Sequence, residues 1–119
     1  MIGAILGDII GSPYEFDRGC KSKEFPLFSS QSTYTDDTVM TLAVGLTFLD
    51  APSSASDDWI LRTLAEHMRK FGKMYPNAGY GGRFRQWLLN PECKAYNSFG
   101  NGSAMRVSSV AWLYNDIDA

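Results

Sequence analysis

The feature that most constrains the fold is an apolar run over residues 39–49, VMTLAVGLTFL. Its apolar side chains would surround a helix on nearly all sides instead of forming one stripe. A helix of this kind is normally buried at the centre of a domain. Asp50 and Pro52 end the run. The sequence therefore predicts a central buried helix that needs neighbours all around it.

A second helix is predicted at the start of the chain, over residues 1–11. Gly3, Gly7 and Gly11 follow one another at intervals of four, so they form a stripe along one side of that helix. The stripe would let another backbone approach closely. Three glycines lower the stability of the helix by roughly 2 to 3 kcal/mol relative to alanine, so packing or a ligand must compensate.

Three more helices follow the central one. Ser56 is a plausible cap for a helix over 57–71, which has acids in its first turn and bases in its last. A short helix is expected over 80–89 and a fifth over 104–114. Alternating strand patterns and repeats are missing from the sequence. The predicted fold is all-α, with residues 1–119 forming a single domain.

Composition narrows the possible partners and the compartment. The chain has 11 Lys and Arg against 13 Asp and Glu, without long blocks of either sign, so we expect no nucleic acid and no membrane as partner. Cys20 and Cys93 fit no metal-binding spacing. The apolar start over 1–10 lacks the pattern of a secretory signal and is too short to span a bilayer. We expect a cytoplasmic protein with free thiols.

Two adjacent acids, Asp36 and Asp37, stand directly before the central helix. One interpretation is a helix start, with Thr35 as the cap and the acids favoured by the helix dipole. The other is a metal site, because a hydroxyl and two carboxylates are ligands that Mg²⁺ or Mn²⁺ prefers. The residues alone leave both open.

A glycine-rich segment, SFGNGS over residues 98–103, precedes the fifth predicted helix. Backbone N–H groups of such a loop, together with a helix N-terminus, can bind a diphosphate. An ordinary turn is the alternative explanation.

Four stretches, in this order, resemble the N-terminal half of the ADP-ribosylglycohydrolase family: GDIIGSPYEF, TDDTVMTLAV, GYGGRFRQWL and SFGNGSAMRVSSVAW. They cover most of the chain. The resemblance implies a truncated domain of that fold. It also implies hydrolysis of a glycosidic bond at the distal ribose of ADP-ribose, on an ADP-ribosylated protein or an ADP-ribose-containing small molecule.

The resemblance also assigns roles. Thr35, Asp36 and Asp37 would supply half of the ligands of a two-metal centre that holds Mg²⁺ or Mn²⁺. Glu15 would lie over the scissile bond, so that Glu15, Asp36 and Asp37 are the catalytic candidates. Asp8, on an apolar helix, needs a polar partner and is interpreted as mainly structural.

Further candidates are expected to bind substrate. For Tyr80 the competing interpretation is core packing. Arg106 either braces the acids or the glycine loop, or is an ordinary surface arginine. His67, the single histidine, is expected at the boundary of the core. The substrate-binding candidates are Tyr80, Ser98, Phe99, Gly100, Asn101 and Gly102.

The family's second metal-binding motif, Asp-x-Asp-Thr, is not found in this sequence. Asp116 and Asp118 have a similar spacing, but no glycine precedes them and no threonine follows them. We therefore do not expect these two residues to replace the missing motif. Uncovered apolar surface favours association, either as a homo-oligomer or with a complementary second chain. The competing hypotheses are a noncatalytic ADP-ribose-binding module and a plain helical domain.

Overall fold

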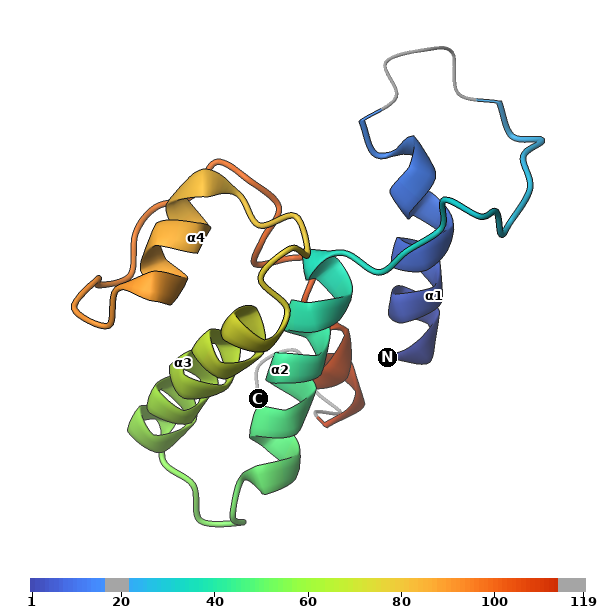
Figure 1. Cartoon of the computed structure of the whole chain (residues 1–119). Helices are drawn as coiled ribbons and strands as arrows, with labels where there is room; N and C mark the ends of the chain where they lie inside the picture. Colours follow the sequence, from blue (N-terminus) through green and yellow to red (C-terminus); the bar gives the residue numbers. More distant parts are fainter. Residues whose placement is uncertain (17–21, 114–119) are drawn as a thin grey trace.

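The computed structural model describes residues 1–16 and 22–113, which form helices and no strand (Figure 1). The all-α prediction is confirmed. In chain order the elements are α1 (Ile2–Gly11), the 3₁₀ helix η1 (Ser12–Tyr14), α2 (Asp36–Asp50), α3 (Asp57–Met74), α4 (Gly82–Leu89) and the 3₁₀ helix η2 (Val107–Trp112).

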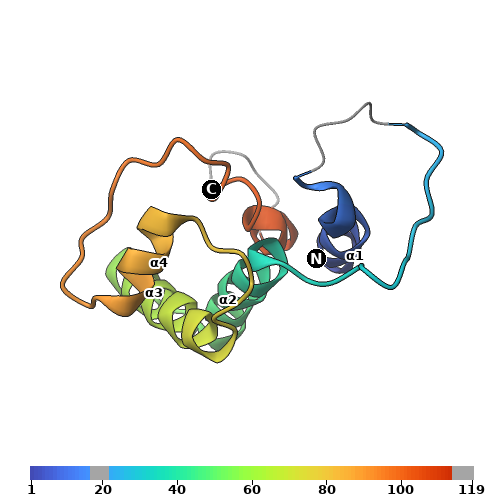
Figure 2. The same ribbon diagram turned by 45° about the horizontal axis from the view of Figure 1, so that its top comes forward.

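Helix α2 is the centre of the domain, as predicted. It packs against α3 on one side and against α1 and η2 on the other (Figures 1 and 2). Val39, Met40 and Ala43 of α2 are almost fully buried, and they form the core with Met68 and Ala78. The buried residues continue along α2 to Thr47, so the apolar run is surrounded over most of its length.

Both predicted caps are present. The Thr35 hydroxyl accepts a hydrogen bond from the Asp37 N–H at 3.3 Å. The Ser56 hydroxyl accepts one from the Trp59 N–H, also at 3.3 Å. Each satisfies a backbone donor that the first turn of a helix leaves without a partner.

The glycine stripe of α1 does not receive the close neighbour that we expected. A Cβ placed on Gly3, Gly7 or Gly11 would meet no atom within 4 Å among the described residues. Close approach occurs elsewhere, where a Cβ on Gly72 of α3 would lie 2.6 Å from the Leu88 side chain of α4. Among the described residues, close approach between elements therefore occurs at Gly72 of α3 and also at Gly45 of α2, where a Cβ would lie 3.0 Å from the Met1 Sδ atom.

The fifth predicted helix is wrong in type. The chain turns over residues 102–106 and then forms η2, a 3₁₀ helix, instead of an α-helix. Hydrogen bonds from the Ala104 N–H to the Asn101 carbonyl (2.8 Å) and from the Leu113 N–H to the Val110 carbonyl (2.9 Å) span three residues, as in 3₁₀ structure. The VSSV sequence explains the difference, because β-branched residues and serines favour the α-helix weakly.

A membrane-spanning helix is not found in the described part of the chain, where every helix is too short or too polar. Cys93 has a free thiol, and Cys20 lies outside the described residues.

Candidate functional site

The start of α2 is fixed by a carboxylate from α1. Asp8 accepts hydrogen bonds from the backbone N–H groups of Thr35 (2.8 Å) and Thr38 (3.2 Å). It also accepts one from each of the two threonine hydroxyls, both at 2.5 Å. These contacts give Asp8 the polar partners that the sequence required, in a structural role. Thr38 was not among the residues predicted from the sequence, although its signal is visible there: the second threonine of TDDT lies three residues after the first, at the same end of the helix.

Three carboxylates gather around this helix start, and the pKa of each is raised. The pKa of Asp36 is raised from 3.8 to about 6, mainly by burial and then by the charges of Asp37 and Glu15. The pKa of Asp37 is raised by burial and then by Asp8, while Arg106 opposes the shift. Burial, Asp37 and Asp8 raise the pKa of Glu15. Glu15 therefore lies within electrostatic range of both aspartates, as the metal hypothesis requires.

A pocket of about 210 Å³ opens beside Asp8 and Glu15, and its lining includes neither Asp36 nor Asp37. Glu15 and Thr35 both line it, so it joins the end of η1 to the start of α2. The Tyr14 ring forms part of its wall and contacts the Phe25 ring edge-on, with centroids 5.2 Å apart. The full lining is Asp8, Gly11, Ser12, Tyr14, Glu15 and Thr35.

Arg106 connects the acids with the glycine-rich loop. Its Nε donates a hydrogen bond to the Gly102 carbonyl, and its guanidinium lies 5.1 Å from the centre of the Phe84 ring. Burial lowers the pKa of Arg106, while Asp36 and Asp37 act to raise it. Arg106 thus holds the loop through the Gly102 carbonyl and lies within electrostatic range of Asp36 and Asp37.

The glycine-rich loop, residues 98–102, is largely exposed to solvent. The Phe99 side chain is fully exposed. The Gly100 N–H already donates to the Ser98 hydroxyl at 3.2 Å. Because turns replace the expected α-helix after the loop, the helix dipole in the diphosphate prediction is missing. Only the backbone N–H groups and the nearby Arg106 remain as features that favour an anion.

Tyr80 combines both interpretations offered for it. Its ring packs against Phe84 at a centroid distance of 5.8 Å, next to the core. Its hydroxyl is buried and has no hydrogen-bond partner among the described residues. Burial, followed by the charge of Asp36, raises the pKa of Tyr80 to about 12. The ring therefore belongs to the core, while the hydroxyl lies within the electrostatic range of Asp36.

The oxygen ligands present suit a hard divalent cation, but only as part of a coordination shell. Asp36 and Asp37 are partly buried acids with raised pKa values, so a cation would stabilise their charges. The Thr35 hydroxyl donates to Asp8 and accepts from Asp37, which leaves one lone pair for a ligand. Within residues 1–16 and 22–113, no three His, Cys, Asp or Glu side chains converge as metal ligands. Asp116 and Asp118 lie outside the described residues.

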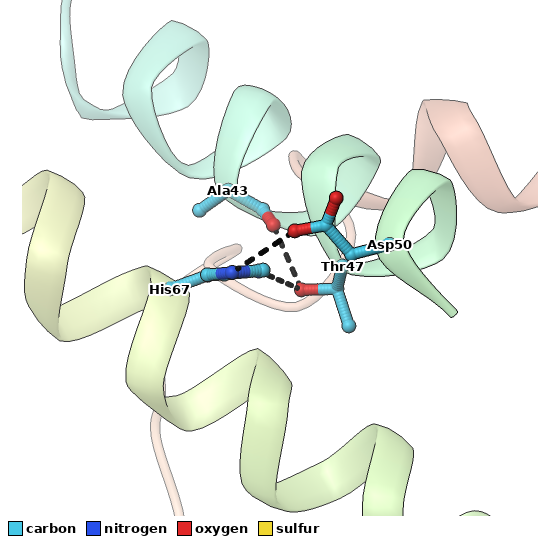
Figure 3. A network of polar contacts seen from close by, with 4 residues as sticks. All are labelled: Ala43, Thr47, Asp50 and His67. Atoms are coloured by element: carbon cyan, nitrogen blue, oxygen red, sulfur yellow. Dashed lines mark hydrogen bonds and ion pairs between the residues drawn. The ribbon is translucent and has the colours of Figure 1, made fainter. Parts of the chain in front are cut away.

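His67 of α3 lies beside the C-terminal end of α2, at the boundary of the core as predicted. Its Nδ1 lies 3.0 Å from the Thr47 hydroxyl, and its Nε2 lies 3.6 Å from an Asp50 carboxylate oxygen (Figure 3). The Thr47 hydroxyl also donates to the Ala43 carbonyl at 2.9 Å (Figure 3). These contacts join α2 to α3, and they give His67 a structural role in the described part of the chain.

Together these features define an all-helical domain with a carboxylate-rich site at the start of its central helix. The chain belongs to the ADP-ribosylglycohydrolase family, whose model matches residues 1–119. ADP-ribosylhydrolase ARH3 of Gallus gallus is 29% identical over 150 residues, covering 98% of this chain and 39% of that protein. The human protein of the same name gives the same figures, and that of Xenopus tropicalis is 28% identical over 140 residues. The chain thus spans about two fifths of the length of these relatives. No solved structure gave a significant match.

Proposed function

We propose that this chain is part of a metal-dependent hydrolase that cleaves the glycosidic bond between ADP-ribose and a protein side chain or another acceptor. The observation that carries the proposal is the pair of partly buried acids Asp36 and Asp37 in the first turn of α2, with Glu15 within electrostatic range of both. Membership in the ADP-ribosylglycohydrolase family and the names of the relatives support the same chemistry.

The candidate residues have two roles, binding of a cation and transfer of a proton. Thr35, Asp36 and Asp37 would hold Mg²⁺ or Mn²⁺, which supplies Lewis acidity and lowers the pKa of a bound water. Glu15 lines the pocket and its pKa is raised above its ordinary value, a direction that favours a role in proton transfer. As water adds to the ribose C1 atom, Glu15 takes a proton from the water. The bond to the acceptor breaks, and the acceptor leaves with the bonding electrons and is protonated by Glu15 or by solvent water. The carboxylates also stabilise the positive charge that develops on the ribose.

Substrate binding is assigned to the loop and the turn that flank the acids. Backbone N–H groups of residues 98–102 would face the diphosphate of ADP-ribose, and Arg106 holds this loop through the Gly102 carbonyl. Tyr80, within electrostatic range of Asp36, is the remaining substrate-binding candidate. We assign the substrate as an ADP-ribosylated protein or a small molecule that contains ADP-ribose.

A complete site needs further ligands, because the described residues bring no three metal-binding side chains together. We propose that a complementary chain or a second copy of this chain supplies them. The exposed apolar side chains of α1 and η2, such as Ile2 (74% exposed) and Trp112 (81%), would then lie in the contact. The same incomplete ligand set favours the second candidate, a noncatalytic module that binds ADP-ribose.

Metal titration tests the proposal directly. We expect Mn²⁺ to bind weakly to the isolated chain, and the double variant D36N/D37N to lose this binding. The matched control is D57N/D58N, since Asp57 and Asp58 are adjacent acids in the first turn of α3 but are exposed. Electron paramagnetic resonance of free Mn²⁺ measures the binding. Equal affinity in the wild type and D36N/D37N would overturn the metal assignment.

An activity assay separates the two candidate functions. Hydrolysis of an ADP-ribosylated peptide in the presence of Mn²⁺ would support the hydrolase, and its loss in Glu15→Gln would locate the proton transfer. Calorimetry measures ADP-ribose binding by the same assembled protein, that is, the chain with its second copy or complementary chain. Binding without hydrolysis would support the noncatalytic module instead.

A further inference from the structure

The Tyr80 hydroxyl is a buried polar group that packing alone does not explain. It has no hydrogen-bond partner among the described residues, and burying such a group without a partner is unfavourable. Phenylalanine would fill the same space without that penalty. A tyrosine here suggests that its hydroxyl gains a partner in another state of the protein.

The backbone holds this tyrosine beside Asp36. Gly79, directly before it, has a φ of 95°, which side chains rarely adopt. A Cβ on Gly79 would lie 3.9 Å from the Asp36 Oδ1 atom, so the turn passes close to the carboxylate. Packing against Phe84 fixes the ring. The hydroxyl is thus kept near Asp36 by a glycine turn on one side and a ring contact on the other.

Asp36 is a natural acceptor for this hydroxyl. A carboxylate has two oxygens with room for several donors, and a neutral tyrosine has one proton to donate. Were one oxygen of Asp36 to hold a cation, the other would remain free to accept from Tyr80.

We propose that Tyr80 is a positioning residue whose hydroxyl donates a hydrogen bond to Asp36 when a divalent cation is bound there. This inference rests on the proposed function. Hydrogen bonds to ligating carboxylates orient them and strengthen metal binding. Tyr80 would therefore act through Asp36, without touching the cation itself.

The test compares two buried hydroxyls that both lack partners. Tyr80→Phe removes the one beside Asp36. Ser109→Ala removes the matched control, a buried hydroxyl in η2 that lies beside Gly45 in the middle of α2. For each variant the Mn²⁺ affinity is measured by paramagnetic resonance, and the thermal midpoint is measured without metal.

We expect Tyr80→Phe to bind Mn²⁺ about tenfold more weakly than the wild type, while its metal-free midpoint stays equal or rises. Ser109→Ala should keep the wild-type affinity. Unchanged Mn²⁺ affinity in Tyr80→Phe would overturn the inference and leave the proposed function standing. No Mn²⁺ binding by the wild type would overturn the metal-dependent function, and this inference with it.

Discussion

Helices α2 and α3 begin with nearly the same sequence, TDD at residues 35–37 and SDD at residues 56–58. In both, the first residue caps the helix with its hydroxyl, at 3.3 Å from a backbone nitrogen. Their surroundings differ, because the acids of α3 are exposed and those of α2 are partly buried beside Asp8 and Glu15. The same local sequence is a simple cap in one place and a candidate site in the other.

The difference shows how burial changes the effect of a helix start on its acids. At any helix N-terminus the dipole favours negative charge. For Asp36, burial and the charges of its neighbours outweigh this benefit and raise its pKa to about 6. A protein that keeps such acids in spite of their unfavourable environment has reason to use their charge, and a cation or a proton is what they would bind.

The largest effect on stability is expected from Asp8→Ala. This variant removes the carboxylate of α1 that accepts hydrogen bonds at the start of α2, a contact without a counterpart at the start of α3. Four donors of Thr35 and Thr38 lose their acceptor, two of them backbone N–H groups. The free energy of unfolding should fall by about 3 kcal/mol. Urea denaturation followed by circular dichroism measures it. Asp58→Ala, at the start of α3, is the control and should change the stability by less than about 0.5 kcal/mol. Similar losses in both variants would mean that Asp8 does not hold α2 in this way.

The two caps provide the next comparison. Ser56→Ala removes one hydrogen bond and should lower the free energy of unfolding by about 1 kcal/mol. Thr35→Ala removes the equivalent bond and also the hydroxyl donor to Asp8, so about 2 kcal/mol is expected. Thermal melts of the two variants, compared with the wild type, decide between them. A smaller loss for Thr35 than for Ser56 would contradict the additional role of its hydroxyl.

This comparison also shows what the sequence could predict. Both caps, the central helix and the short α4 follow from local patterns, because hydroxyls before acids and apolar runs act within a few residues. The need for a polar partner at Asp8 was visible, but its partners are not, since Thr35 lies 27 residues away. Burial of the TDD acids, and exposure of the SDD acids, depends on tertiary packing that no local pattern contains.

Two further differences from prediction have local causes. The segment RVSSVAW has helical spacing of apolar residues but weak helix formers, and it forms 3₁₀ structure. The stripe of Gly3, Gly7 and Gly11 predicted a close neighbour, whereas close packing in the described residues occurs at Gly72 and Gly45. Spacing showed where small residues align, but it could not show which of them meets another helix.

Opposite signs are expected when one acid of each helix start is neutralised. Asp36→Asn removes a partly buried charge, so the metal-free chain should become more stable at pH 7. Its raised pKa corresponds to roughly 1 kcal/mol after allowance for its partial exposure to solvent. Asp57→Asn removes an exposed charge that the dipole favours and should lower stability by about 0.3 kcal/mol. Chemical denaturation at pH 7 measures both, and a loss of stability in Asp36→Asn would contradict the electrostatic description of this site.

The smallest expected effect is the pH dependence of the metal-free chain. Because the pKa of Asp36 is about 6 in the folded state against 3.8 ordinarily, the folded state binds more protons between these values. Its contribution to stability is therefore present at low pH and is lost as the pH rises through about 6. The raised pKa values of Glu15 and Asp37 act in the same direction. Lowering the pH from 7 to 5 should thus stabilise the wild type, by less than about 1 kcal/mol. Asp36→Asn should lose most of this gain, whereas Asp57→Asn should keep it.

Mn²⁺ binding should show the opposite trend and weaken toward pH 5, because protons compete for the same carboxylates. Calorimetric melts at both pH values, with and without Mn²⁺, measure the two trends, and parallel trends would show that Asp36 is not the group that links them.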